Sequence, residues 1–469
     1  MSTPTSDNRE AFRDSIGTIS EDGKRLHLHP KRATGKFTTW RQRVSYLLLA
    51  FLFAGPWLRI GGMPLLQLDV LHRRFILLGQ VFWPQDFHLL VILMLLSVLA
   101  VALFTIALGR LFCGWICPQT IFMEHVFRRI EYWIDGDRNA QIKLQNQKWD
   151  AEKIRKRLLK NTLFALVSFA ISNTFLMYLI GTDAWLQLLE EGPAKHTGGF
   201  AAIVIFTGVF FFVFAWFREQ VCLIVCPYGR LQGVLLDRNS LVIAYDRVRG
   251  EDRAPVRKGE DRAAAGKGDC VDCGLCVQVC PTGIDIRNGT QLECINCTAC
   301  IDVCDEVMVK THQDPGLIRF ASEANIAEKK PFTYTPRLKA YSVLFLALSV
   351  LMVALLFLRL EVEATVLRAP GQTFQVHDTA YTNLYTYKLI NKSGREGVLS
   401  MALPPGAPGA IQWIGPSVQK ADAKGMTKGS FFLWLSKKDV HGSKNKVNLV
   451  VFLDGVEVDR IRTQFYGPR

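Results

Sequence analysis

Cysteine is the residue type in this sequence whose number and spacing predict chemistry, because eight of the twelve cysteines fall between residues 270 and 304. They form two runs with the spacing C-x2-C-x2-C-x3-C. This spacing is typical of proteins that hold two [4Fe-4S] clusters, in which the fourth cysteine of each run binds the other cluster. The sequence therefore predicts one cluster on Cys270, Cys273, Cys276 and Cys304, and a second cluster on Cys294, Cys297, Cys300 and Cys280.

Structural zinc is the main alternative for such cysteines. Zinc sites use two separated C-x2-C pairs, and a third cysteine at the same interval has no place in a tetrahedral site. Asp305 follows the second run where Pro281 follows the first, and we expect the acidic neighbour to lower the potential of its cluster without removing ligation. Clusters that exchange ligands must lie close together, so we expect an electron relay; a purely structural role is the alternative.

The other four cysteines form two C-x3-C-P motifs, one at 113–118 and one at 222–227, each just after a long apolar stretch. Positions i and i+4 share one side of a helix, and the proline ends or kinks that helix. We therefore predict that Cys113, Cys117, Cys222 and Cys226 converge and carry the catalytic chemistry. Four convergent sulfurs suit copper, a further iron–sulfur cluster or a dithiol–disulfide couple, whereas buried structural cysteines are the simpler alternative.

The elements that must position these cysteines are membrane helices. Of the 469 residues 49% are apolar, including 30 Phe and 10 Trp, which is too many for an ordinary soluble protein. Five apolar stretches are long enough to cross a bilayer: 44–60, 88–109, 161–181, 199–217 and 340–359. Five crossings place the two ends of the chain on opposite sides, and the polar start shows no cleaved signal peptide.

The orientation follows from the basic residues. Lys and Arg are dense in 1–43 and 110–160, whereas the loop 182–198 holds one lysine and three acidic residues. Because basic loops stay inside, the N-terminus and the segment 218–339 are predicted to be cytoplasmic. The net charge of +14 is spread over membrane-flanking loops without a nucleic-acid motif, which argues against a nucleic-acid partner.

The predicted organisation is a membrane α-helical protein with a cytoplasmic ferredoxin-like module and an outer β domain. The outer domain has short alternating runs broken by Gly, Pro, Asn and Asp, which predict seven or eight strands in an immunoglobulin-like sandwich without a disulfide. We expect it to bind a periplasmic partner. The expected segments are a cytoplasmic tail at 1–43, four transmembrane helices within 44–217, a cytoplasmic segment at 218–339 with the ferredoxin module at 265–315, a fifth transmembrane helix at 340–359 and the periplasmic domain at 360–469.

Three motifs occur together in this chain: CGWICPQT from residue 113, CLIVCPYGR from residue 222 and CVDCGLCVQVCPTGIDIRNG from residue 270. In this combination the sequence resembles the CcoG family, also called FixG or RdxA, from the first helix to the sandwich. The resemblance implies an inner-membrane protein of Gram-negative bacteria, a cupric reductase that converts Cu(II) to Cu(I) for assembly of the cbb(3)-type cytochrome oxidase. Copper as substrate or transient ligand, and copper chaperones and oxidase subunits as partners, are implied in the same way, together with an electron donor that the resemblance does not name.

The implied reaction agrees with metal chemistry, because Cu(I) prefers thiolate and thioether ligands and iron–sulfur clusters supply single electrons. Two alternatives stay open. The first is a quinol dehydrogenase that feeds a periplasmic reductase, as in the NapH and NosR relatives, and the second is a non-enzymatic assembly scaffold. The C-terminal sandwich favours the CcoG branch over the first alternative.

Overall fold

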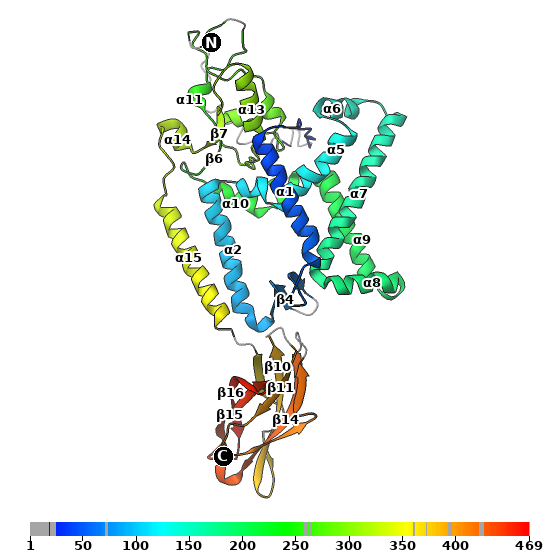
Figure 1. Ribbon diagram of the computed structural model, residues 1–469, viewed down its shortest axis with the longest axis vertical. Coiled ribbons are helices and arrows are strands. Elements are labelled where there is room, and N and C mark those ends of the chain that lie inside the picture. The colour runs from blue at the N-terminus through cyan, green and yellow to red at the C-terminus, as the bar shows by residue number, and fades with distance from the viewer. Residues whose placement is uncertain are drawn as a thin grey trace. The chain divides into compact units, whose positions relative to one another are not determined.

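The computed structural model describes residue 18 and residues 25–468, apart from 71–73, 258–259, 263, 360–361, 372, 393–395 and 422–425. The chain forms two compact units (Figure 1). The first unit comprises Met1–Ala54, Ile92–Leu176 and Trp185–Val350, and the second comprises Gly55–Val91, Met177–Ala184 and Leu351–Arg469.

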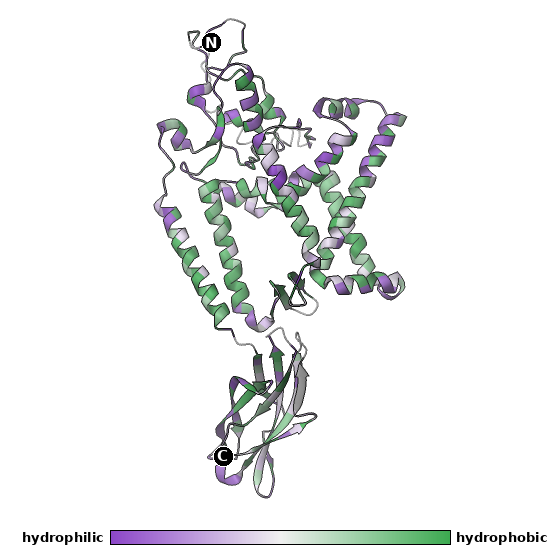
Figure 2. Cartoon of the chain, in the orientation of Figure 1, coloured by the Kyte–Doolittle hydropathy of each residue, from purple (hydrophilic) through white to green (hydrophobic). Residues whose placement is uncertain are grey.

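Four helices in the described residues are long and apolar enough to cross a membrane: α2 (Phe87–Leu108), α7 (Ala151–Ile180), α9 with its π-helical end η6 (Thr197–Phe217) and α15 (Pro336–Phe357). Figure 2 shows long hydrophobic stretches along them, with hydrophilic residues at the start of α7 and α15. Large apolar side chains such as Val98, Val204 and Val343 are more than 60% exposed on them, which a lipid environment would accept. Four of the five predicted spans thus lie in such helices.

The first predicted span, 44–60, differs from the observed helix. Helix α1 covers Lys36–Ala54, so it begins earlier and ends before the turn at Gly55–Trp57. It ends there because the residue before Pro56 is sterically disfavoured in a helix. Its first half is polar, with Lys36, Arg41 and Arg43, and α1 is therefore not among the four candidate spans.

The predicted basic loop 110–160 is helical. Around it the first unit has a core of aromatic side chains, in which Phe127 stacks on Phe214 with ring centroids 4.4 Å apart and meets Phe164 edge-on at 4.8 Å. The helices within residues 110–160 that precede α7 are α3 (Leu111–Trp115), α4 (Pro118–Ile121), the π-helix η5 (Phe122–Phe127), α5 (Arg128–Ile134) and α6 (Arg138–Asn146). Further along the chain, α8 (Thr182–Lys195) lies between α7 and α9, and the π-helix η7 (Val221–Val225) and α10 (Pro227–Leu235) follow η6.

The cysteine-rich segment folds as a small module in the first unit. Strands β6 (Val242–Tyr245) and β7 (Ile318–Ala321) pair antiparallel and close it. Between them lie four short helices, of which α12 and α13 carry cysteines of the two runs: α11 (Arg247–Gly250), α12 (Leu275–Gln278), η8 (Ile286–Asn288) and α13 (Ala299–Lys310). Helix α14 (Glu323–Glu328) follows β7.

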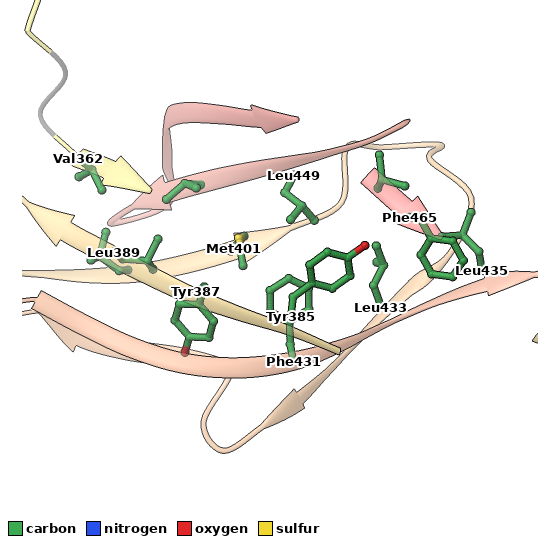
Figure 3. Close-up of a cluster of buried hydrophobic side chains, with 13 residues drawn as sticks. Val362, Tyr385, Tyr387, Leu389, Met401, Phe431, Leu433, Leu435, Leu449 and Phe465 are labelled. Carbon is green, nitrogen blue, oxygen red and sulfur yellow. The ribbon is translucent and has the colours of Figure 1, made fainter. Parts of the chain in front are cut away.

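The second unit contains an immunoglobulin-like sandwich, as predicted, with nine strands in the described residues. One sheet has the order β12-β14-β10-β8 with β9 on β10, and the other has the order β13-β11-β15-β16. Figure 3 shows the core between them, including Tyr385, Phe431 and Phe465, each 0% exposed. The strands are β8 (Val362–Arg368), β9 (Gln375–Val376), β10 (Ala380–Asn391), β11 (Gly397–Ala402), β12 (Ala410–Ile414), β13 (Val418–Ala421), β14 (Met426–Ser436), β15 (Lys444–Leu453) and β16 (Val456–Tyr466).

The predicted outer loop 61–87 contributes short strands to the same unit. They are β1 (Arg59–Ile60), β2 (Met63–Pro64), β3 (Leu66–Asp69), β4 (Arg74–Leu77) and β5 (Gln80–Phe82), followed by the turn η4 (Pro84–Asp86). Met63, Val81 and Trp83 pack against Ile390 of the sandwich.

A buried ion cluster joins these strands to the sandwich. The carboxylate of Asp86 pairs with Lys392 at 2.6 Å and Arg359 at 2.8 Å, and Lys392 also pairs with Glu363 at 2.6 Å. Burial alone would raise the pKa of Asp86, but the hydrogen bond from Lys392 and the nearby positive charges hold it below its usual range. Buried ion pairs therefore help to hold the segment around Asp86 against the sandwich within the second unit.

Candidate functional site

The eight clustered cysteines line two adjacent cavities in the module. Cys270, Cys273, Cys276 and Cys304 line the first. The second is lined by Cys280, Cys294, Cys297 and Cys300, and Cys276 contributes to its lining as well. The structure thus brings together the two predicted sets of four, including the exchange of the last cysteine of each run.

The backbone explains how each run turns its thiols toward one cavity. Asp272 and Asn296 stand at equivalent places in the two runs, and both have a positive φ, of 54° and 51°. Gly274 and Thr298 are the next equivalent pair, with φ of 65° and 67°, and each is the residue before a helix, α12 or α13. Left-handed residues curl the chain tightly, so cysteines three residues apart can face the same point.

Apart from the cysteines, most of the side chains that line the cavities are apolar, and Arg287 of the first cavity and Thr282 of the second are polar. Ile243, Ile284 and Ile286 lie in the wall of the second cavity. Burial raises the pKa of Cys294 and of Cys304 to about 12, so four thiolates need a cationic partner to exist there. Sulfur donors in apolar cavities of this kind fit two [4Fe-4S] clusters.

The two C-x3-C-P motifs have the same local structure, which differs from the predicted single helical turn. Cys113 lies in α3 and Cys222 in η7, but each helix stops before the second cysteine. Cys117 and Cys226 are instead the residues that precede the next helices, α4 and α10, which begin at the proline. The proline disfavours a helical conformation at the residue before it, and this breaks the helix inside each motif.

The four thiols of these motifs form a loose group. All four are half-buried and unoxidised. The pKa of Cys222 is raised to about 12, first by burial and then by Cys117, Cys113 and Cys226, which places the other three sulfurs near it. Within the described residues, no three His, Cys, Asp or Glu side chains lie close enough to hold a single metal ion.

A buried glutamine that the sequence motifs did not reveal joins the two motifs. Gln232 of α10 is 0% exposed; its amide nitrogen donates to the sulfur of Cys113 at 3.4 Å, and its carbonyl oxygen accepts from Arg110. Arg110 also donates to the backbone carbonyl of Gly229. Arg110 could have been recognised in the sequence as the first charged residue after an apolar stretch, whereas no sequence feature marks Gln232.

The first motif also touches the second cysteine cavity. A Cβ atom at Gly114 would lie 2.4 Å from the carbonyl oxygen of Ile295, so only glycine permits this approach. Cys113 packs in the same hydrophobic cluster as Cys297 and Cys300. The second cavity is therefore the one that lies beside the first C-x3-C-P motif.

Buried ion pairs fix the turn before the second motif. Arg218 has a positive φ of 51° and donates to both oxygens of Glu131, at 2.7 and 2.8 Å. Arg128 pairs with Glu219 at 3.1 Å. Burial would raise the pKa of Glu131, but Arg218, Lys160 and Arg128 lower it to about 2, so the carboxylate stays charged.

Comparison with known proteins agrees with this architecture. The family described as "4Fe-4S dicluster domain" matches residues 217–323, "4Fe-4S binding domain" matches residues 90–140, and the Ig-like fold at the C-terminus of FixG matches residues 352–468. Protein RdxB of Cereibacter sphaeroides is 36% identical over 393 residues, which cover 80% of this chain and 82% of that protein. Nitrogen fixation protein FixG of Rhizobium meliloti is 35% identical over 314 residues, covering 65% of this chain and 59% of that protein.

A crystal structure of a FixG-related protein from Vibrio parahaemolyticus is also similar, with 15% identity and a TM-score of 0.20, covering 23% of this chain and 95% of that chain. The apolar helices, the two cysteine cavities and the dicluster match define a membrane iron–sulfur electron-transfer protein. Within that class, the chain belongs to the FixG/RdxA family, which confirms the resemblance of its motifs.

Proposed function

We propose that this protein is a cupric reductase, which transfers one electron to Cu(II) and releases Cu(I) for assembly of a cbb(3)-type cytochrome oxidase. The observation that carries the proposal is that Cys113 packs against the buried cluster that contains Ile295 and Cys297. Cys113 would therefore lie beside the second iron–sulfur site, since Ile295 and Cys297 also line that cavity. When bound, the clusters supply single electrons, at potentials that range from about −700 to +450 mV in proteins.

The thiols of Cys113, Cys117, Cys222 and Cys226 offer soft sulfur ligands that favour the reduced product, although no three of them are close enough to share one ion in the described structure. Thiolate sulfur prefers Cu(I), whereas Cu(II) prefers nitrogen and oxygen. The amide N–H of Gln232 donates to Cys113 and lowers the pKa of that thiol, against the larger opposing effect of burial. Cys117 and Cys226 sit at helix breaks and are only half-buried, so copper can reach them.

The proposed location is the bacterial inner membrane, with the module in the cytoplasm and the sandwich in the periplasm. The start of α1 is bound to the module, because Thr38 donates its hydroxyl and its N–H to Asp302. The segment after α1 is bound to the sandwich through Asp86 and Lys392. Because α15 separates module and sandwich in the chain, α1 has to cross as well, giving five crossings. Its 19 residues span about 28 Å at 1.5 Å per residue, close to the ~30 Å of a bilayer core.

The test is anaerobic. The protein is purified in detergent and reduced, its clusters are verified by their spectrum, and Cu(II) is added while its EPR signal is followed. We expect rapid loss of that signal with stoichiometric cluster oxidation, and we expect Cys226→Ala to slow the loss at least about tenfold, the effect of removing about 1.4 kcal/mol of stabilisation.

Val225→Ala is the matched control, since Val225 is 61% exposed on the same turn, and it should behave as wild type. The cluster spectra should be unchanged in both variants. Persistent Cu(II) beside reduced clusters would reject the cupric reductase and favour the quinol dehydrogenase or the scaffold.

A further inference from the structure

A pocket of about 390 Å³ lies in the first unit beside the second cysteine cavity. Val279, Pro281 and Ala299 form one wall, and they flank Cys280 and Cys300 in the sequence. The pocket uses none of the membrane thiols. Its size is within the usual range for small-molecule sites.

The N-terminal segment builds the pocket by bridging two parts of the unit. The backbone N–H of Lys31 donates to the carbonyl of Gln278 in the module at 2.7 Å. On the other side, the hydroxyl of Tyr132 donates to the carbonyl of Pro30 at 3.0 Å, and the N–H of Arg32 donates to Asp137 at 2.9 Å. The walls are therefore held by defined hydrogen bonds.

The pocket is strongly positive. Four cations line it, against one acid, Glu124, which already pairs with Arg128 at 3.0 Å. Burial first, and then Arg41 and Arg129, lower the pKa of His125 to about 3, so its imidazole is neutral at physiological pH. The four lining cations are Lys31, Arg32, Arg41 and Arg129.

Two of the lining side chains have unmet hydrogen-bonding capacity. Arg41 is 5% exposed; its Nε donates to the carbonyl of Gly114 at 2.7 Å, but its Nη2 has no hydrogen-bond partner among the described residues. His125 is 7% exposed, and its Nε2 also lacks a partner within the described part of the chain. Buried polar groups are normally satisfied, and an anionic ligand seated against them would supply the missing acceptor. The aromatic rings of Tyr132 and Trp133 line the same pocket and offer a surface for a planar ring.

We propose that this pocket binds a small organic anion that carries a phosphate group and a planar ring, and that it is the site of the electron donor. The donor role rests on the proposed function, whereas the binding does not. A reduced flavin phosphate has this chemistry: on oxidation it gives up two electrons and two protons. The oxidised iron–sulfur clusters that the two four-cysteine sites would hold could accept one electron each, and the two protons would be released to solvent.

The binding test uses flavin mononucleotide and riboflavin as probes, because they share the ring and differ in the phosphate. Binding to the full-length holoprotein in detergent is followed by quenching of flavin fluorescence, without copper. We expect riboflavin to bind at least about tenfold more weakly, since a charge-assisted hydrogen bond contributes about that factor.

Arg129→Gln and Lys31→Gln should each weaken the binding of flavin mononucleotide about tenfold. Arg43→Gln is the matched control. Arg43 lies on the same helix as Arg41, is exposed over Trp40 and does not line the pocket. Equal affinity for the two probes, or equal loss in the Arg43 variant, would overturn the site.

A second readout addresses the donor role. Photoreduced flavin mononucleotide should bleach the cluster absorbance of the wild type, and should do so at least about tenfold more slowly in Arg129→Gln at subsaturating probe. Bleaching that is equally fast in both proteins would overturn the donor role. If the protein failed to reduce Cu(II), the results of the flavin-binding and cluster-bleaching experiments would be unchanged. The proposed flavin site can therefore be tested separately from the proposed cupric reductase.

Discussion

Single side chains couple the parts of this site, and Gln232 is the clearest example. It contacts Arg110 and Cys113 at once, and it comes from the helix that follows the second motif. One amide thus holds the first thiol motif against the second. The amide N–H of Gln232 also lowers the pKa of Cys113, against the larger opposing effect of burial.

Gln232→Leu should therefore have two effects. Leaving the buried Arg110 without its acceptor should cost about 2 kcal/mol, seen as a lower thermal unfolding midpoint. Loss of the amide donor should also raise the pKa of Cys113 further above that of an ordinary thiol, since burial already raises it. Alkylation of Cys113, followed by mass spectrometry, should then require a higher pH.

Leu231→Ala is the control for this change, because Leu231 is 55% exposed on the same helix. Unaltered alkylation of Cys113 in the glutamine variant would contradict the role of Gln232.

The site could be predicted from the sequence where ligands repeat at fixed spacing, as the cysteine runs do. The backbone at Thr298 could not be predicted in this way. Its φ of 67° is close to the 65° of Gly274, yet threonine is not a residue type that predicts a left-handed turn. Gln232, Arg41 and His125 were missed because their roles come from contacts with segments far away in the chain. Such contacts leave no local pattern.

Among the elements, helix α1 shows how a distant residue sets a boundary. Asp302 of α13 accepts from the backbone N–H groups of Phe37 and Thr38, at 3.0 and 2.6 Å, and so satisfies the start of α1. Hydropathy predicted the apolar half of this helix, but the polar half is helical because of a carboxylate that lies 265 positions further along the chain. The four other spans needed no such help, since their apolar stretches are long enough by themselves.

Asp302→Ala should loosen the start of α1. Loss of this cap should cost about 1 to 2 kcal/mol, and hydrogen exchange of the amides at 36–42 should become faster. Glu306→Gln is the matched change on the same helix, since Glu306 forms an exposed pair with Lys310. If both variants exchange alike, the carboxylate of Asp302 does not hold the helix.

The whole molecule combines an electron-transfer part with a sandwich that is fixed by buried charge. Asp86→Asn should destabilise the second unit by about 3 kcal/mol at neutral pH, because Lys392 and Arg359 would lose a buried partner. The tryptophan fluorescence of the full-length protein during unfolding would measure this. The exposed pair of Glu457 and Arg460 provides the control, as Glu457→Gln.

The same group predicts a pH dependence. The folded pKa of Asp86 is below its unfolded value. Its stabilisation is therefore fully present above the unfolded pKa of about 4 and is lost as the pH falls through the folded pKa. The wild type should lose stability below about pH 4, and the Asp86→Asn protein should lose less over the same range. Parallel curves would show that Asp86 is not responsible.

The number of crossings is also a property of the whole chain. A protease site inserted at the open turn Gly61–Gly62 should be cut from the periplasmic side of spheroplasts, and one inserted in the segment before α1 only in inverted vesicles. Cleavage of both sites from the same side would mean that α1 does not cross the membrane.

The cysteines of the two predicted cluster sites differ in exposure, so the two sites should differ in their sensitivity to oxidants and chelators. Cys273 is exposed, whereas Cys297 is buried. Dioxygen and chelators in solution can therefore reach the first iron site directly, whereas the surrounding protein shields the second iron site. In air the cluster at the first site should therefore be lost before the cluster at the second site, beside which Cys113 packs.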